Sequence, residues 1–344
     1  MKLAVDAMGG DYAPEEVIKG VEQARDAYPD IEFLVFGQAE RVTPLVTNMT
    51  RISVKNADEV ITMEDEPVRA VRRKKNSSIV LAAQAVKDGE ADAFFSAGNT
   101  GAVLAAGLFI VGRIKGIDRP GLTTTMPIIG SETANQFVML DVGANADYKP
   151  FNLVQYAIMG KSYAESVMHV ANPRIGLLNN GTESDKGDRA HRATYDALAG
   201  LTDINFVGNV ESRDLLNGPA DVVVTDGFTG NATLKAIEGT ALTMLSTIKD
   251  GIMAGGMKSK LGALMLKDTF RSVGHQMDYS QYGGAVLLGL QAPVVKTHGS
   301  SKAKTIKNTI AQIKAMVDGG SVKDVNTYFE THSDDMAALK DKLK

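Results

Sequence analysis

Short apolar runs alternate with longer segments of helical periodicity along almost the whole chain, and this alternation constrains the fold most. Strands are predicted at Leu3–Val5, Ile31–Phe36, Ile52–Val54, Ala93–Phe95, Phe137–Leu140, Ile175–Leu178, Ile204–Val207, Val222–Val224 and Val294–Val295. Leu153–Val167 and Ser301–Val317 are among the helical segments between them. Strands that are apolar along their length and alternate with helices are typical of a parallel sheet covered on both faces. We therefore expect an α/β fold of this kind.

Composition narrows the class of protein. Of the 344 residues 44% are hydrophobic, which is enough for a large core, and no Pro- or Ser-rich linker divides the chain. We expect a single α/β/α catalytic unit over residues 1–344, with room for two lobes around a cleft.

Charge and residue types exclude several classes of function. The net charge of −4 argues against a general affinity for nucleic acid. The absence of Cys excludes disulfides and thiolate chemistry. Asp6 interrupts the N-terminus too early for a signal peptide, so a cytoplasmic location is expected.

One region, Ala241–Phe270, contains no strand candidate. Two helical patterns there are separated by Gly255-Gly256, which predicts a helical hairpin inserted at residues 241–270. Its apolar face carries Met244, Met253, Met257 and Met265. This face suits packing in the core or against a second subunit. With Lys258, Lys260 and Lys267 it also suits peripheral contact with a membrane, and both interpretations remain open.

Polar, Gly-rich loops follow six of the predicted strands. They are Asp6–Asp11, Ser96–Gly101, Asp141–Asn145, Asn179–Glu183, Thr225–Asn231 and Lys296–Ser301. In open parallel sheets ligands bind beyond the carboxyl ends of the strands, and Gly lets the backbone approach an anion there. The N–H groups that begin the next helix can then donate to that anion. Ser, Thr and Asn are also common helix caps, so a single loop says little. The six together, expected at one edge of the sheet, predict a site for a phosphate-bearing ligand.

Several familiar motifs are missing. The chain has no G-x-G-x-x-G, no P-loop, no G-x-S-x-G and no H-E-x-x-H, and its five His residues are scattered. We therefore predict no metal site. His298 is the one His in a strand-end loop, and structural and functional roles are equally open for it.

A basic run, Arg69, Arg72, Arg73, Lys74 and Lys75, is expected to open a helix that continues through Ile79 and Leu81. Such a run is commonly a solvated face. It also suits docking of an acidic partner or of phosphate.

Seven segments together resemble a known family. DAMGGD, DEPVRAVRRKKNSS, SAGNTGA, DVGAN, TDGFTGN, YGGAVLLG and HGSS, in this order, closely resemble the bacterial phosphate acyltransferases of phospholipid synthesis. The resemblance extends from Met1 to about Gln312, and Gly319–Lys344 reads as a closing helix without a functional motif. It implies conversion of acyl-acyl carrier protein and inorganic phosphate into acyl phosphate, with no organic cofactor. It further implies a dimeric three-layer α/β/α sandwich with a mostly parallel sheet, similar to phosphate acetyltransferase and isopropylmalate dehydrogenase. The product would pass to a membrane glycerol-3-phosphate acyltransferase.

Within this resemblance, ten residues are candidates for the site. Lys186 is expected to face phosphate or the developing oxyanion, and Asp226 to orient Lys186 or act as a weak base. Asn231 is expected to donate to the carbonyl oxygen or to cap its helix, and His298 is the remaining catalytic candidate. The candidates for substrate binding are Asn99, Thr100, Asn145, Asn180, Ser300 and Arg73.

Two other enzyme classes compete with this interpretation. A nicotinamide-dependent cleft dehydrogenase would need a dinucleotide site, which the sequence does not show. A CoA-dependent phosphate acetyltransferase differs from the main interpretation in its acyl donor. A third alternative is a membrane-recruited scaffold without activity.

Overall fold

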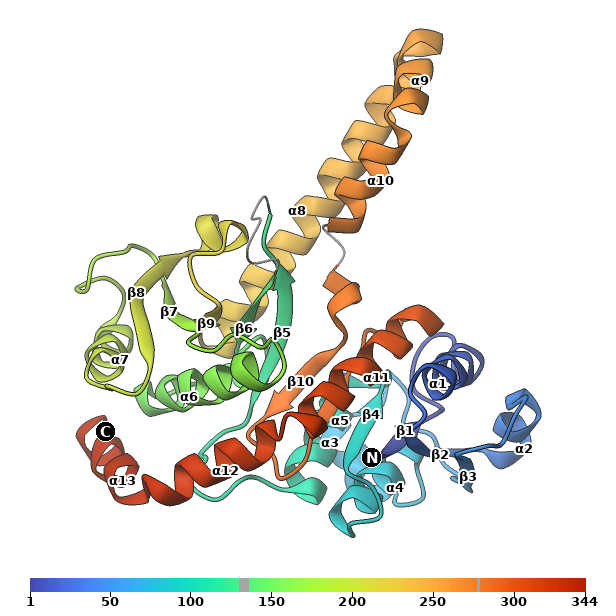
Figure 1. Ribbon diagram of the computed structural model, residues 1–344, viewed down its shortest axis with the longest axis horizontal. Coiled ribbons are helices and arrows are strands. Elements are labelled where there is room, and N and C mark those ends of the chain that lie inside the picture. Colours follow the sequence, from blue (N-terminus) through green and yellow to red (C-terminus); the bar gives the residue numbers. More distant parts are fainter. Residues whose placement is uncertain (130–135, 277–278) are drawn as a thin grey trace.

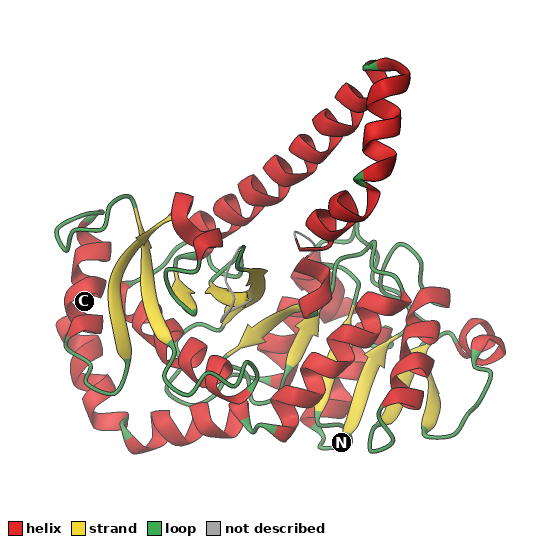
Figure 2. Ribbon diagram, turned by 45° about the horizontal axis from the view of Figure 1, so that its top comes forward, coloured by secondary structure: helices red, strands yellow, loops and turns green. Residues whose placement is uncertain are grey.

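In the described part of the chain, a single sheet of eleven strands has helices on both faces (Figure 1, Figure 2). The computed structural model describes residues 1–129, 136–276 and 279–344. The strand order is β3-β2-β1-β4-β11-β10-β5-β6-β9-β7-β8. The strands are β1 Lys2–Asp6, β2 Glu32–Gly37, β3 Ile52–Asn56, β4 Ala93–Ser96, β5 Gly121–Pro127, β6 Gln136–Leu140, β7 Arg174–Asn179, β8 Asn205–Glu211, β9 Val222–Val224, β10 Ala285–Leu288 and β11 Val294–Lys296.

All nine predicted strands are present, and two more, β5 and β10, lie in the middle of the sheet. These two form the antiparallel pairs β11–β10, β10–β5 and β5–β6. The other neighbours are parallel, so the prediction of a mostly parallel sheet is confirmed.

The three antiparallel pairs reverse the direction of the strands between the two halves of the sheet. Strands β1, β2, β3, β4 and β11 run one way, and β6, β7, β8 and β9 run the opposite way. The expectation that all six polar loops lie at one edge is therefore wrong. The loops after β1, β4 and β11 form one group, and those after β6, β7 and β9 form another.

The helices form two layers around this sheet. They are α1 Glu15–Ala27, α2 Ala39–Val42, α3 Pro67–Arg73, α4 Ser78–Lys87, α5 Thr100–Ala106, α6 Pro150–Ser166, α7 Arg189–Ala199, α8 Gly227–Ala254, α9 Gly256–Met265, α10 Lys267–Gln276, α11 Ala303–Asp318, α12 Ser321–Thr331 and α13 Ser333–Lys342. Short 3-10 or π turns lie at Thr43–Leu45, Gly107–Val111, Ser212–Asn217 and Tyr279–Tyr282. The closing helix expected at Gly319–Lys344 is two helices, α12 and α13.

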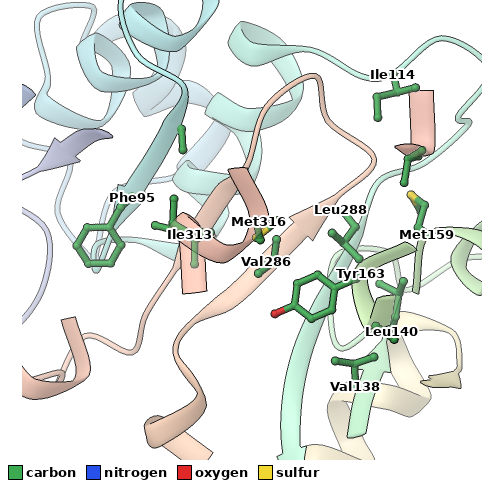
Figure 3. Packing of buried hydrophobic residues seen from close by; sticks show 14 of the residues in the cluster. Phe95, Ile114, Val138, Leu140, Met159, Tyr163, Val286, Leu288, Ile313 and Met316 are labelled. Atoms are coloured by element: carbon green, nitrogen blue, oxygen red, sulfur yellow. The ribbon is translucent and has the colours of Figure 1, made fainter. Parts of the chain in front are cut away.

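The core continues across both halves of the sheet on one face. Side chains of α1, α6 and α11 pack there against the strands, as Phe95, Val138, Val286 and Ile313 show (Figure 3). On the other face, α3, α4 and α5 cover the first half, and the start of α8 packs on the second. Burying one such apolar side chain is worth about 1.5–3 kcal/mol, so this shared core holds the two halves together.

The expected hairpin is present and is longer than residues 241–270. Helix α8 leaves the body of the protein, and α9 and α10 return beside it (Figure 1, Figure 2). Gly256, with φ of +74°, begins α9 at the turn, a conformation that favours Gly. None of the α9 residues is buried.

Candidate functional site

The loops after β1, β4 and β11 meet because glycines let their backbones approach closely. A Cβ atom on Gly9 would lie 2.6 Å from the backbone nitrogen of Gly98 and 2.4 Å from Asp6 Oδ2. A Cβ on Gly10, whose φ is +111°, would lie 3.1 Å from the carbonyl oxygen of Gly299. The backbone N–H of Asp11 donates to that same oxygen at 2.8 Å. We call these three loops the first loop group.

A buried carboxyl braces the first loop group. Asp6 accepts a hydrogen bond from the Ser96 hydroxyl at 2.6 Å and another from the N–H of Met8 at 3.0 Å. The Ser96 hydroxyl in turn accepts from the N–H of Gly98 at 2.9 Å. Burial raises the pKa of Asp6, although its hydrogen bonds act in the opposite direction. Asp6 therefore ties the β1 turn to the β4 turn.

Asn99 is the N-cap of α5. Its Oδ1 accepts from the N–H of Ala102 at 3.1 Å, and its Nδ2 donates to the carbonyl oxygens of Thr62 and Asp65 at 3.0 and 3.2 Å. The side-chain amide thus has partners within the protein, as the capping interpretation expects. The neighbouring Thr100 is exposed. Their contact with phosphate remains a prediction, and Thr100 is the one with a side chain open to solvent.

His298 and Ser300 lie together in the loop after β11. The Nδ1 atom of His298 lies 2.8 Å from the Ser300 hydroxyl and accepts from the N–H of Ser300 at 3.3 Å. Both side chains are exposed. The structure places these two predicted residues in the first loop group and leaves their roles as predictions.

Sequence reasoning missed Lys296, the last residue of β11. It is partly buried, and burial lowers its pKa to about 8, while the charge of Asp11 acts in the opposite direction. Its place in the Lys296–Ser301 loop was visible in the sequence. Its burial was not, because that depends on β10, which was not predicted.

The loops after β6, β7 and β9 form a second loop group. The carboxylate of Asp141 accepts from the N–H groups of Leu122, Gly143, Ala144 and Asn145 at 2.8–3.0 Å. The Asn145 side chain also donates to Asp141, at 3.0 Å, to Tyr156 Oη at 3.0 Å and to the carbonyl oxygen of Pro120 at 2.7 Å. Asn145 is thus bound into the loop, and its role toward substrate remains a prediction.

Asp226 and Asn231 lie at the start of α8. The Asp226 carboxylate accepts from the N–H groups of Phe228 and Thr229 at 3.0 and 2.9 Å, so Asp226 is the N-cap. The expectation that Asn231 caps this helix is therefore wrong. Instead, the Asn231 side chain lies against Gly143, where a Cβ would be 3.5 Å from its Cγ. Asn231 is partly exposed beside the Asp141–Asn145 loop.

Lys186 lies in the loop after β7, with its ammonium 3.9 Å from Glu183 Oε2 and its side chain 44% exposed. In the described residues no ion pair joins it to Asp226, so the expected orientation by Asp226 is not seen. Asn180, in the same loop, is exposed. Within the described chain, the Lys186 ammonium has only the long ion pair with Glu183 and is partly exposed, which is compatible with an anionic ligand; that role remains a prediction.

Tyr148 links the loops after β6 and β7, and it was not a candidate from the sequence. Its hydroxyl lies 3.0 Å from His191 Nδ1 and 3.2 Å from Asp188 Oδ2. Burial, with the nearby charges of Asp188 and Asp226, raises the pKa of Tyr148. The tyrosine therefore keeps its proton, which it donates to Asp188.

The basic run does not form the single helix expected. Helix α3 ends at Arg73 and α4 starts at Ser78, because Lys74 turns back to pair with Asp65 at 2.6 Å. Arg73 is exposed. Arg72 lies over the Phe109 ring at 5.8 Å from its centre.

The two loop groups border the same packed junction. Leu104 of α5 and Ala144 of the β6 loop both pack against the clusters under each half of the sheet. Two hollows beside β10 and α12, and one beside α12 and α13, have linings that include Ile114, Met316 and Phe329, but no predicted site residue. The chemistry therefore points to the strand ends rather than to these hollows. Across the described residues, no three His, Asp or Glu side chains are grouped to hold a metal ion.

Comparison with known proteins decides the family. The model of a family described as "Fatty acid synthesis protein" matches residues 1–323. A protein of Levilactobacillus brevis named "Phosphate acyltransferase" is 72% identical over 344 residues, all of both chains. One of Lactiplantibacillus plantarum with the same name is 64% identical over 341 residues, 99% of this chain and 98% of its own. The chain belongs to the bacterial phosphate acyltransferases. It is therefore an acyltransferase, as the resemblance implied.

Solved structures agree on the fold. A phosphotransacetylase from Streptococcus pyogenes superposes with a TM-score of 0.61 at 17% identity and covers 94% of both chains. A branched-chain phosphotransacylase from Enterococcus faecalis has a TM-score of 0.58 at 14% identity, covering 92% of this chain and 99% of its own. The expected likeness to the phosphate acetyltransferase fold is confirmed. At this identity the likeness concerns fold alone.

Proposed function

We propose that this phosphate acyltransferase transfers an acyl group from acyl-acyl carrier protein to inorganic phosphate and so supplies acyl phosphate for membrane phospholipid synthesis. The observation that carries the proposal is the close approach of three glycine-bearing strand-end loops, one of which begins at partly buried Lys296, within a chain of this family. Backbone N–H groups and a cation are the groups that hold a small dianion.

The reaction needs positioning more than a protein nucleophile. A phosphate oxygen forms a bond with the thioester carbonyl carbon, the carbonyl becomes a tetrahedral oxyanion, and its collapse breaks the C–S bond. The thiolate then takes a proton from solvent, and because a thiol has a pKa of about 8.5 it leaves without a strong acid. Holding two reactants in line supplies up to about 7–11 kcal/mol of the barrier, and an oxyanion donor adds about 3–4 kcal/mol. Asn231 and Lys186 are suitable donors for the oxyanion.

The surface of α3 supports a protein-linked donor. Arg69, Arg72 and Arg73 are exposed there, and Val68 and Phe109, also exposed, lie on α3 and on the Gly107–Val111 turn that follows α5. An acidic carrier protein would meet both charge and apolar contact on this surface.

The proposal includes the setting of the enzyme. We place it in the cytoplasm as a homodimer, in peripheral contact with the membrane and delivering acyl phosphate to a membrane glycerol-3-phosphate acyltransferase. The described residues contain no helix long and apolar enough to cross a bilayer. The exposed apolar side chains of α8 and α9 support a partner surface of some kind.

The test is an assay of the purified protein with inorganic phosphate and either acyl-acyl carrier protein or acyl-CoA. Hydroxylamine traps acyl phosphate as the hydroxamate, which is then measured. We expect hydroxamate that depends on phosphate and a higher kcat/KM with the carrier-linked donor. Preference for short acyl-CoA would favour a phosphate acetyltransferase, and no product with either donor would favour a scaffold.

A further inference from the structure

Lys296 lies in a row of polar side chains across three strands. In the β11–β4 pairing Lys296 stands beside Ser96, and Ser96 is hydrogen bonded to Asp6 at the end of β1. Paired residues of parallel strands point to the same face of a sheet, so these three side chains share one face. They all stand at the carboxyl ends of their strands, where the first loop group begins.

The ammonium of Lys296 has few partners within the protein. Its Nζ donates to the carbonyl oxygen of Thr297, the next residue, which directs it forward to the loop. Among the described residues no carboxylate lies within ion-pair distance of it. An ammonium has three N–H donors, so two remain for another acceptor. By contrast, Lys74 pairs with Asp65, and Lys314 pairs with two carboxylates.

The turn from Lys296 to Ser301 also holds two hydroxyl groups without a hydrogen-bond partner among the described residues. Thr297 and Ser301 are 2% and 8% exposed, and in the described part of the chain their hydroxyl oxygens have no hydrogen-bond partner. Buried hydroxyls usually have a partner, because leaving one unsatisfied costs free energy. Two such groups lie in the same six-residue turn as Lys296, whose ammonium has donors to spare, and together they indicate a missing acceptor; one with several oxygens fits best.

We propose that Lys296 and the buried hydroxyls of Thr297 and Ser301 bind the inorganic phosphate that attacks the thioester. This inference rests on the proposed function and adds to it the residues that hold the nucleophile. Helix α11 starts two residues after Ser301 with no side-chain cap, so its N-terminal dipole also favours an anion here.

The first experiment measures binding of inorganic phosphate by calorimetry, without acyl donor, in wild type and in Lys296→Met. We expect Kd to rise at least about tenfold, as for loss of a charge-assisted hydrogen bond. The KM for phosphate should rise in step, whereas the KM for the acyl donor stays within about twofold. Lys304→Met, which removes an exposed lysine in the first turn of α11, is the matched control and should bind as wild type. An unchanged Kd in folded Lys296→Met would overturn the proposal.

A second variant keeps the test decisive if Lys296→Met fails to fold. Lys296→Arg retains a positive charge at every pH used, whereas the wild-type lysine has a pKa of about 8. Asp11 is the charged group that acts on Lys296, with the buried carboxyl of Asp6 in the same row. Between about pH 7 and about pH 9, phosphate affinity should fall more in wild type than in Lys296→Arg. Equal pH dependence in the two proteins would contradict the assignment.

The hydroxyls are tested separately with Thr297→Val and Ser301→Ala. Each should weaken phosphate binding by about two- to tenfold, which is the contribution of one hydrogen bond, and an unchanged Kd in both variants would remove the two hydroxyls from the site.

The measurements also distinguish failure of the proposed function from failure of the phosphate site. Phosphate bound through Lys296 without formation of acyl phosphate would refute the proposed function and leave this site standing. Formation of acyl phosphate, together with full phosphate affinity in Lys296→Met, would support the proposed function and refute this phosphate site.

Discussion

Lys186 and Asn231 are two candidates of the second loop group whose side chains are available for chemistry. They follow β7 and β9, which are neighbours in the sheet, and both are partly exposed. We expect Lys186→Ala and Asn231→Ala each to lower kcat/KM by at least about tenfold, as loss of an oxyanion donor does. Steady-state kinetics with unchanged melting temperatures is the measurement. Lys235→Ala, an exposed lysine on the same helix as Asn231, is the control, and near-normal activity in both site variants would remove them from the mechanism.

Asp141 organises the second loop group through hydrogen bonds that the sequence could not reveal. Its carboxylate accepts four backbone N–H bonds and one from Asn145. Asp141→Ala would leave several of those donors buried and unsatisfied, at about 1–3 kcal/mol for each one that finds no water. We expect the free energy of unfolding to fall by about 3 kcal/mol or more in urea titration. Asp147→Ala, at an exposed position six residues away, should change it by less than about 0.5 kcal/mol. Equal stability of the two variants would contradict this role.

The sequence predicted the loops of the candidate site more reliably than it predicted the role of each side chain within them. Asn99 and Asp226 cap helices, which follows from their position before α5 and α8. Their loops were predicted to be near substrate, and a cap supports such a loop without touching the ligand. Lys296 was passed over because its burial arises from long-range pairing with β4 and β10.

Among the elements, the strands that were missed are the two that depart from the parallel pattern. β5 is centred on Thr123, Thr124 and Thr125, which do not form an apolar run although all are buried in the sheet. β10 is only four residues long and follows Gly283-Gly284. Because antiparallel pairing reverses strand direction, two missed strands were enough to misplace three loops relative to the other three.

The hairpin of α8, α9 and α10 exposes apolar side chains that a protein in water normally covers. Leu261 and Leu264 are 60% and 65% exposed. Burial of each in a bilayer interface is worth about 1.5–3 kcal/mol, and each nearby lysine adds about 1 kcal/mol on an anionic surface. We expect Leu261→Glu combined with Leu264→Glu to abolish co-sedimentation with anionic vesicles.

The control for this experiment is Val207→Glu, which places one such charge on an exposed apolar residue of β8. The dimer state is measured in parallel by light scattering. Unaltered co-sedimentation would exclude the hairpin as an anchor. Loss of vesicle binding together with loss of the dimer would instead assign these leucines to the contact between subunits.

At the scale of the whole molecule, the fold was predictable and the arrangement of its site was not. Alternation of strands and helices gave the layers, since it depends only on local periodicity. The position of the two loop groups depends on the order and direction of all eleven strands. That order brings β11, from the end of the chain, between β4 and β10. No local pattern encodes such a pairing.

The charge of the whole molecule gives the last prediction. The net charge is −4, so an acidic carrier protein is repelled on average and needs a local basic surface. Exposed Arg72 and Arg73 on α3 provide one. Reversing both, as Arg72→Glu with Arg73→Glu, should raise the KM for acyl-acyl carrier protein about tenfold at low salt. The effect should shrink toward 0.15 M salt, where the screening length is about 8 Å.

Lys323→Glu with Lys342→Glu makes the same change in net charge on α12 and α13 and should leave KM within about twofold, because steering depends on where the charge lies. An equal rise of KM in both double variants would assign the effect to net charge, and an unchanged KM in the α3 variant would make this run a solvated face.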